Sequence, residues 1–110
     1  MDNMKNTLKR GLVRNIIFKE DDTWYGVGLE FNIVTEGDTP EMAAFNLQEA
    51  ILGYVESIKK SKVGGLRTAP MLNQTSDPEY EALWNKLEDD EPIPSPYQIH
   101  SFGKILLPIT

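Results

Sequence analysis

The sequence has no cysteine in its 110 residues, which excludes disulfide bonds and thiolate metal sites. It also lacks an apolar N-terminal stretch of the kind that a signal peptide needs. No apolar run approaches the roughly 20 residues of a membrane-spanning helix. We therefore expect a cytoplasmic protein without a membrane partner.

Residues for catalysis are scarce as well. His100 is the only histidine, and no P-loop, GxGxxG or HExxH pattern occurs. Glu30, Glu36, Asp38 and Glu49 are the one set of carboxylates that could hold Mg²⁺ in a nuclease site. Glu36 and Asp38, however, belong to a helix-capping region, and acidic runs are usually solvated. We predict a protein that is not an enzyme, with no catalytic residue, metal site or cofactor.

Positive charge is missing from the middle of the chain. The net charge is −6, and no lysine or arginine occurs between residues 20 and 58. An acidic segment of this kind repels nucleic acid and attracts basic proteins, although it also serves plain solubility. A basic N-terminal segment offers the alternative of a contact with nucleic-acid phosphates. Its cations are Lys5, Lys9, Arg10 and Arg14.

The N-terminal third of the sequence predicts β-strands. Residues 12–20 and 24–31 alternate apolar and other side chains and predict a β-hairpin, and a third short strand follows at about 32–36. Gly26 and Gly28 thin one face of the second strand, which indicates either the close approach of another backbone or a local bulge.

A helix from about Pro40 to Lys60 follows the third strand. Gly37 permits a turn, Thr39 is a good N-cap, and Pro40 fits the first helical position. One apolar stripe of the helix is predicted to cover the sheet. It consists of Ala43, Leu47, Ala50, Ile51, Tyr54 and Ile58.

A second apolar group lies opposite that stripe. Met42, Phe45 and Leu52 occur there, with Glu49 and Glu56 close by. A helix that only covers a sheet does not need such a group, so Phe45, Glu49, Leu52 and Glu56 are the candidate partner-binding residues. In the alternative interpretation, a second helix of this chain packs on Phe45 and Leu52.

The C-terminal half predicts that second helix and a last strand. Residues 61–76 read as a loop, and Asp77-Pro78 starts a helix of about ten residues. Its stripe consists of Tyr80, Leu83, Trp84 and Leu87. Three prolines from Pro92 to Pro96 predict a stiff arm. The last strand, 98–109, ends in an apolar run that favours burial on both faces. The predicted fold class is α+β with the order β-β-β-α-α-β. The predicted organisation is a flexible basic arm at 1–11 followed by a single domain at 12–110.

Three segments resemble the HicB family of antitoxins. They are Trp24-Tyr25-Gly26-Val27-Gly28, the capping segment Thr35-Glu36-Gly37-Asp38-Thr39 with the helix after it, and the acidic, proline-spaced stretch from Leu87 to Pro96. The resemblance implies a partial RNase H-like fold, in which a three-stranded meander, a helix and a returning strand form one domain. Residues 61–80 then form an insertion. The family's Pro-Asp-Leu-Pro-Gly-like bend is replaced by Leu29-Glu30-Phe31-Asn32-Ile33.

The resemblance also implies a function and partners. HicB proteins neutralise small basic HicA-type toxins that cleave mRNA, and they form homo-oligomers. Many add a C-terminal DNA-binding unit, whereas this sequence ends at Thr110, directly after the last predicted strand. The expectation is therefore toxin neutralisation more than direct DNA binding. The alternative is an orphan HicB-like regulatory or structural module without a cognate toxin.

Overall fold

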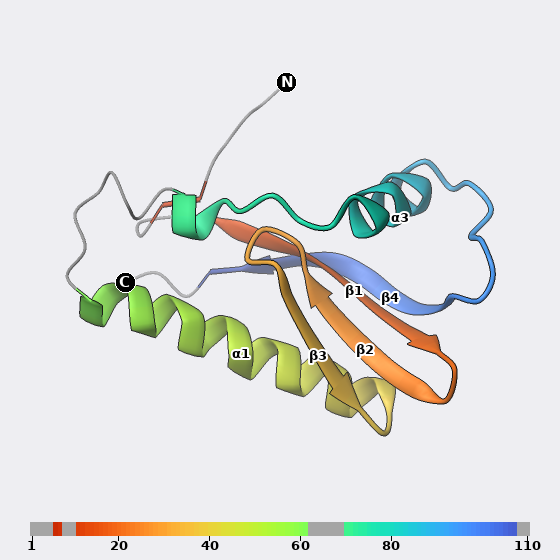
Figure 1. Ribbon diagram of the computed structural model, residues 1–110, viewed down its shortest axis with the longest axis horizontal. Helices are drawn as coiled ribbons and strands as arrows, with labels where there is room; N and C mark the ends of the chain where they lie inside the picture. The colour runs from red at the N-terminus through yellow and green to blue at the C-terminus, as the bar shows by residue number, and fades with distance from the viewer. Residues whose placement is uncertain (1–5, 8–10, 62–69, 108–110) are drawn as a thin grey trace.

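A computed structural model describes residues 6–7, 11–61 and 70–107 of the chain. It has the predicted α+β fold, with an antiparallel sheet and helices in the expected order (Figure 1). The elements are β1 (Leu12–Glu20), β2 (Thr23–Gly28), β3 (Ile33–Gly37), α1 (Pro40–Ser61), α3 (Pro78–Glu88) and β4 (Gln98–Leu106). Residues 70–72 form a helical turn within the segment predicted as a loop, and residues 62–69 of that segment lie outside the described part.

The sheet has the strand order β3-β2-β1-β4. The predicted hairpin is confirmed: β1 and β2 pair antiparallel, with Phe18 opposite Tyr25. Asp21 and Asp22 form its turn with φ values of 56° and 60°. Both are in the left-handed region, which a short polar side chain such as that of aspartate tolerates.

The boundary between β2 and β3 differs from the prediction. The strand expected over 24–31 ends at Gly28, and residues 29–32 form a turn before β3. Asn32 closes this turn with φ 55° and donates its backbone N–H to the carbonyl of Leu29 at 3.1 Å. Asparagine adopts φ > 0 more readily than most residues, which suits Asn32 to close the turn between β2 and β3.

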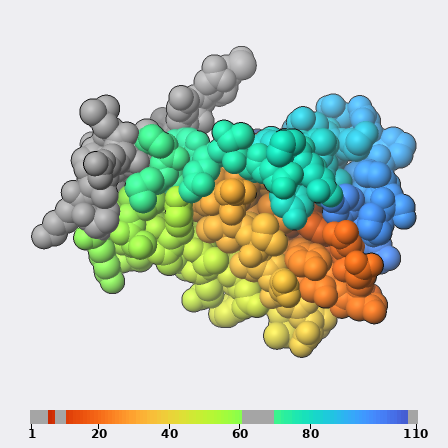
Figure 2. Space-filling model, in the orientation of Figure 1, coloured from red at the N-terminus to blue at the C-terminus, as the bar shows by residue number. Residues whose placement is uncertain are grey.

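The two helices lie on opposite faces of the sheet (Figures 1 and 2). On the α1 side, Val13 and Ile17 of the sheet pack with Leu47, Ile51 and Val55. On the α3 side, Ile16, Phe18, Val27 and Leu29 pack with Leu83 and Trp84. The hydrophobic core is therefore divided by the sheet into two layers, each closed by one helix.

The junction between β3 and α1 is tightly packed. Thr39 caps α1 as predicted, because its Oγ1 accepts a hydrogen bond from the N–H of Met42 at 3.1 Å. Gly37 is required for a different reason from the one expected, since no glycine in the described ranges has a positive φ. A Cβ on Gly37 would lie 2.5 Å from the backbone nitrogen of Ala43, and one on Gly26 would lie 2.9 Å from the carbonyl oxygen of Ala43. The backbone approach predicted at Gly26 is thus confirmed, and it holds α1 against the sheet.

The environment of the last strand is not the one predicted. Among the described residues β4 pairs only with β1, so it is an edge strand and not a strand buried on both faces. The side chain of Leu106 is 76% exposed and that of Phe102 is 41% exposed. The prediction is wrong because an apolar run reports how hydrophobic a strand is and not its place in the sheet. Residues 108–110 of the predicted strand lie outside the described ranges.

The N-terminal segment is anchored at Asn6, which is buried. Its backbone N–H donates to Oδ1 of Asn73 at 2.7 Å, and its side-chain amide donates to the carbonyl of Leu72 at 3.0 Å. Its Oδ1 accepts the N–H of Leu12 at 2.8 Å. Asn6 therefore joins the start of β1 to the turn at 70–73 and is not part of a free arm; residues 1–5 and 8–10 are not among the described residues.

Candidate functional site

α1 presents two different faces. Its inner face buries Ala43, Leu47, Ile51, Val55 and Ile58 against the sheet. Four of these were in the predicted stripe. Val55 was missed, and the predicted Ala50 and Tyr54 lie at the margin of the buried face, half-buried. The turn of the helix places its remaining side chains on the side away from the sheet.

The outer face of α1 carries the four candidate partner-binding residues. Phe45 is 61% exposed and Leu52 is 39% exposed, and Glu49 and Glu56 are exposed between and beyond them. Residues 45, 49, 52 and 56 follow one another at intervals of three and four, which aligns them along one side of a helix. We call this set the α1 outer face. Met42, also exposed, extends it by one turn toward the start of the helix.

No second helix of the described chain covers this face. The alternative interpretation, in which the stripe of α3 packs on Phe45 and Leu52, is wrong. Leu83 and Trp84 of α3 are buried on the opposite side of the sheet. Figure 1 shows the reason: the sheet lies between the two helices. The α1 outer face is thus an exposed row of apolar and acidic side chains.

Within the described ranges, the carboxylates of this face form no ion pair. The ion pairs among the described residues involve Arg14 and Lys86, and none includes Glu49 or Glu56. Uncompensated carboxylates beside an exposed phenylalanine favour a partner that brings positive charge and an apolar surface together. They disfavour a second copy of the same face, because like charges would then oppose one another.

A shallow hollow of about 280 Å³ lies where β3 meets α1. It is lined by Thr23, Glu36, Gly37, Asp38, Met42 and Asn46. Met42 belongs both to this hollow and to the α1 outer face, so the two form one continuous surface. Thr23, Met42 and Asn46 were not among the residues predicted for the site. The exposed Met42 at helical spacing from Phe45 was the signal that could have added it.

The four carboxylates considered for a Mg²⁺ site do not converge. Glu30 accepts from Nε of Arg14 at 2.6 Å and from the backbone N–H of Arg14 at 2.8 Å. Glu36 and Asp38 line the hollow at the start of α1, and Glu49 lies on the α1 outer face. Within the described ranges, no group of three or more histidine, aspartate or glutamate side chains is placed to hold a metal ion.

Arg14 is engaged in an ion-pair network and not in a basic arm. Besides Glu30, it contacts Glu81 of α3 through two hydrogen bonds of 3.0 and 2.8 Å. Ser76 donates a further hydrogen bond to Glu81 at 2.6 Å. The guanidinium of Arg14 also lies 5.6 Å from the ring centre of Trp84. Of the four cations considered for a nucleic-acid contact, Arg14 is therefore occupied, and Lys5, Lys9 and Arg10 lie outside the described residues.

The network shifts the pKa values of Glu81 and Arg14. Burial by itself would raise the pKa of Glu81, but the hydrogen bonds from Arg14 and Ser76 and the charge of Arg14 outweigh burial and lower it. Burial would lower the pKa of Arg14, and the hydrogen bonds and charges of Glu81 and Glu30 raise it instead. These shifts mean that the ionised forms of Glu81 and Arg14 stabilise the packing of α3 on the sheet.

His100 is exposed on β4, and its ring meets the ring of Trp24 edge-on at 5.8 Å. Lys19 lies over the same indole, 5.9 Å from its centre. An aromatic contact of this kind indicates that the histidine has a packing role.

None of the helices in the described part of the chain is long and apolar enough to cross a membrane. Family models, curated proteins and solved structures were all compared with the chain, and none of them matches it. The candidate site is therefore defined by its own geometry.

Proposed function

We propose that this protein is a non-catalytic, antitoxin-like binding protein that neutralises a small basic HicA-type mRNA-cleaving toxin. The observation that carries the proposal is the α1 outer face, where Phe45 and Leu52 stay exposed beside Glu49 and Glu56. A monomer gains nothing for its own stability from exposing a phenylalanine on the outside of its longest helix. A partner that buries it does gain binding energy.

The charge of this face supports a basic ribonuclease as the partner. An enzyme that cleaves mRNA must offer positive charge to the phosphates of its substrate. The carboxylates of the α1 outer face can occupy the same cations, which speeds association and competes with RNA. Phe45 and Leu52 then supply the apolar anchors that hold the complex together. In this arrangement the antitoxin blocks the surface through which the toxin binds RNA.

Reversing the charge of the face tests the proposal. Where a small basic protein is encoded directly beside this one, it is mixed with the double variant Glu49→Lys plus Glu56→Lys, and binding is measured by calorimetry. We expect affinity to fall by about 100-fold, because two favourable charge contacts become repulsive. The matched control is Glu88→Lys plus Asp89→Lys, which makes the same change in net charge at exposed positions at the far end of α3.

Two results would contradict the assignment. If both double variants weaken binding equally, net charge and not the α1 outer face governs the interaction. If neither weakens it, the partner binds elsewhere. A parallel growth assay, in which the toxin is induced together with each variant, should show rescue by the control and not by the α1 variant.

The alternative function is an orphan HicB-like module that regulates or supports another protein. The same exposed face would serve such a role, so the genomic neighbourhood distinguishes the two. A short reading frame for a basic protein directly beside this one favours the antitoxin, and its absence favours the orphan. Either role places the protein in the cytoplasm, where mRNA is cleaved and where a chain without cysteine needs no oxidising environment.

A further inference from the structure

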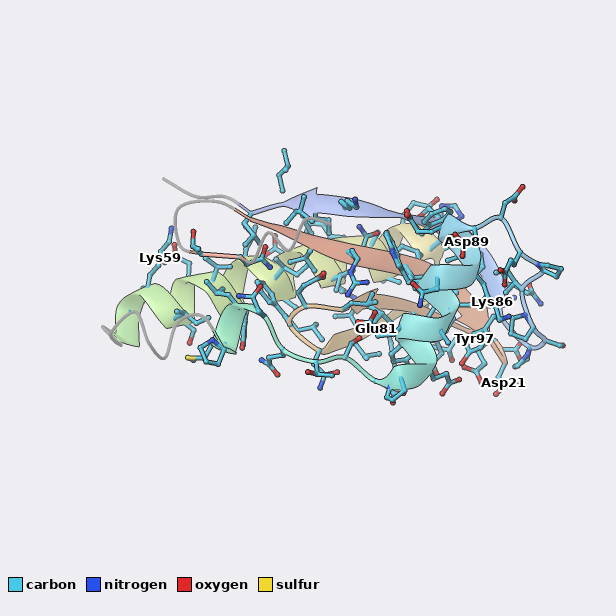
Figure 3. All side chains as sticks on the ribbon, turned by 90° about the horizontal axis from the view of Figure 1, so that it is seen from above. Asp21, Lys59, Glu81, Lys86, Asp89 and Tyr97 are labelled. Atoms are coloured by element: carbon cyan, nitrogen blue, oxygen red, sulfur yellow. The ribbon has the colours of Figure 1, made fainter. Side chains whose placement is uncertain are left out.

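β4 is an open edge of the sheet with apolar side chains along it. It is nine residues long and pairs with β1 on one side only. Figure 3 shows β4 (blue) forming the margin of the sheet, on the side away from β2 and β3. Leu106 and Phe102, the exposed apolar side chains of this strand, lie on one face of it with Lys104 between them. An exposed strand of this length is a template for pairing with another strand.

The hydrogen bonds of β1 and β4 show which groups of β4 point outward. Leu107 donates its N–H to the carbonyl of Gly11 at 3.0 Å, so the backbone of residue 107 faces β1. Because these directions alternate along an antiparallel strand, Ile105 and Gly103 also face β1. The N–H and C=O groups of Phe102, Lys104 and Leu106 therefore face away from the sheet. None of the hydrogen bonds described for the structure uses them.

The other edge of the sheet is protected. β3 has only five residues and carries the exposed carboxylate of Glu36. Short length and charge are the usual means by which edge strands avoid pairing. β4 carries no carboxylate, although the chain as a whole has a net charge of −6. β4 itself thus brings no carboxylate toward a second copy of this acidic protein.

We propose that two copies of this protein pair their β4 strands antiparallel, about a two-fold axis at Lys104, to form one continuous sheet. In this register Phe102 of each copy lies opposite Leu106 of the other. Three residue pairs then have their outward backbone groups face to face, and each such pair exchanges two hydrogen bonds. The arrangement uses every outward group identified above, and it pairs the exposed apolar side chains of the strand with each other.

Neighbouring registers fit less well. Antiparallel pairing requires outward groups to face outward groups, so the next allowed axes pass through Gly103 and Ile105. An axis at Gly103 places Phe102 opposite Lys104 and leaves Leu106 beyond the paired outward groups. An axis at Ile105 places Leu106 opposite Lys104 and leaves Phe102 beyond the paired outward groups. The register at Lys104 has one unfavourable feature, which is that the two Lys104 side chains oppose each other. Their ammonium groups are exposed on flexible stems, and salt screens the repulsion.

A second copy fits this edge better than a strand from a different protein. The pattern of Phe102, Lys104 and Leu106 is its own complement under a two-fold rotation, and a two-fold pairing closes without leaving β4 open. Pairing β4 to the β3 edge of another copy would instead build an open filament. The inference is independent of the proposed antitoxin function, because α1 packs against β1, β2 and β3 and its outer face stays accessible in the dimer.

Proline substitution tests the edge. Lys104→Pro removes an outward N–H and leaves the hydrogen bonds between β4 and β1 in place, so the fold should persist. We expect the dissociation constant of the dimer to rise by about 10- to 100-fold in sedimentation equilibrium, because each dimer loses two main-chain hydrogen bonds. Val34→Pro on β3 is the matched control. Thr35 pairs with Gly26 and faces β2, so the N–H of Val34 faces outward in the same way, and dimerisation should not change.

Charge tests the register. When Lys104→Glu is mixed with an equal amount of the unsubstituted protein, the register at Lys104 predicts that the mixed dimer exceeds the share given by random pairing, because a lysine then faces a glutamate. Native mass spectrometry counts the three species. A monomer at all concentrations, or a dimer unaffected by Lys104→Pro, overturns the proposal. A purely statistical mixture of dimers overturns the register.

Discussion

Replacing Gly37 by alanine is expected to lower the free energy of unfolding by about 3 kcal/mol. The added Cβ would lie 2.5 Å from the backbone nitrogen of Ala43 and 2.9 Å from the carbonyl carbon of Met42. Both are main-chain atoms of α1, so no side-chain rotation can relieve the contact and the helix itself must move. Overpacking costs about 1–3 kcal/mol when neighbours can adjust. A neighbour that is a helix backbone places this site at the upper end of that range.

Gly53 provides the matched control, because the same substitution should have the opposite sign there. Gly53 is exposed in the middle of α1, and a Cβ on it would meet no atom within 4 Å. Alanine at this position should raise the free energy of unfolding by about 0.5–1 kcal/mol, since glycine is a poor helix former. Urea unfolding of the two variants should therefore show midpoints on either side of that of the original protein, with equal m-values.

Asparagine at position 37 separates steric exclusion from backbone freedom. If Gly37 were needed for a left-handed turn, asparagine would be tolerated far better than alanine. Its φ is not in the left-handed region, so both side chains should meet α1 and destabilise to a similar extent. The reasoning fails if Gly37→Ala unfolds at the same urea concentration as the original protein, or if Gly37→Asn restores the stability that alanine loses.

Two further predictions concern the helices. Glu81→Gln should cost about 1–2 kcal/mol at pH 7, because it removes a partly exposed ion pair with Arg14. The pKa of Glu81 is lowered from its ordinary 4.5, so this stabilisation is present above that pH and is lost as pH falls through the lowered value. Urea midpoints of the two proteins should therefore converge in acid, and a constant gap would contradict the assignment. Trp84→Ala should cost about 3–5 kcal/mol and Phe45→Ala less than about 0.5 kcal/mol, because Trp84 is buried and Phe45 is exposed. Equal losses in thermal unfolding would show that Phe45 is part of the core.

Local signals in the sequence predicted the elements that are defined by local physics. The period-two pattern of residues 12–20, the cap at Thr39 and the start signal Asp77-Pro78 each act within a few residues of the chain. The structure confirms all three. At the start of α3, for example, Oδ1 of Asp77 accepts a hydrogen bond from the backbone N–H of Glu79 at 2.8 Å. The end of β2 was missed because Asn32 was not considered as a turn residue, although asparagine tolerates its φ of 55°.

Features that depend on distant parts of the chain were not predictable in this way. Whether α3 packs on Phe45 or on the far side of the sheet depends on the path of residues 61–76, which carries no periodic signal. The place of β4 depends on strand order. An apolar run in the sequence can occur in a central strand or in an edge strand, so it does not distinguish the two. The candidate residues of α1 were correctly separated from its buried stripe because helical periodicity is local, whereas their exposure depends on where α3 lies.

The position of α3 leads to both functional proposals. Each helix covers one face of the sheet, so neither can cover the α1 outer face or the edge of β4. The charges of these two exposed surfaces then distinguish their partners. Glu49 and Glu56 on α1 repel a second copy and attract a cation-rich protein, whereas β4 has Lys104 as its formal charge at neutral pH and can approach a second copy. Because β4 lies at one edge of the sheet and α1 packs on the other three strands, assembly through β4 leaves two α1 outer faces available. A dimer of this kind can therefore offer two α1 outer faces at once, and the two proposed interactions do not compete for the same residues.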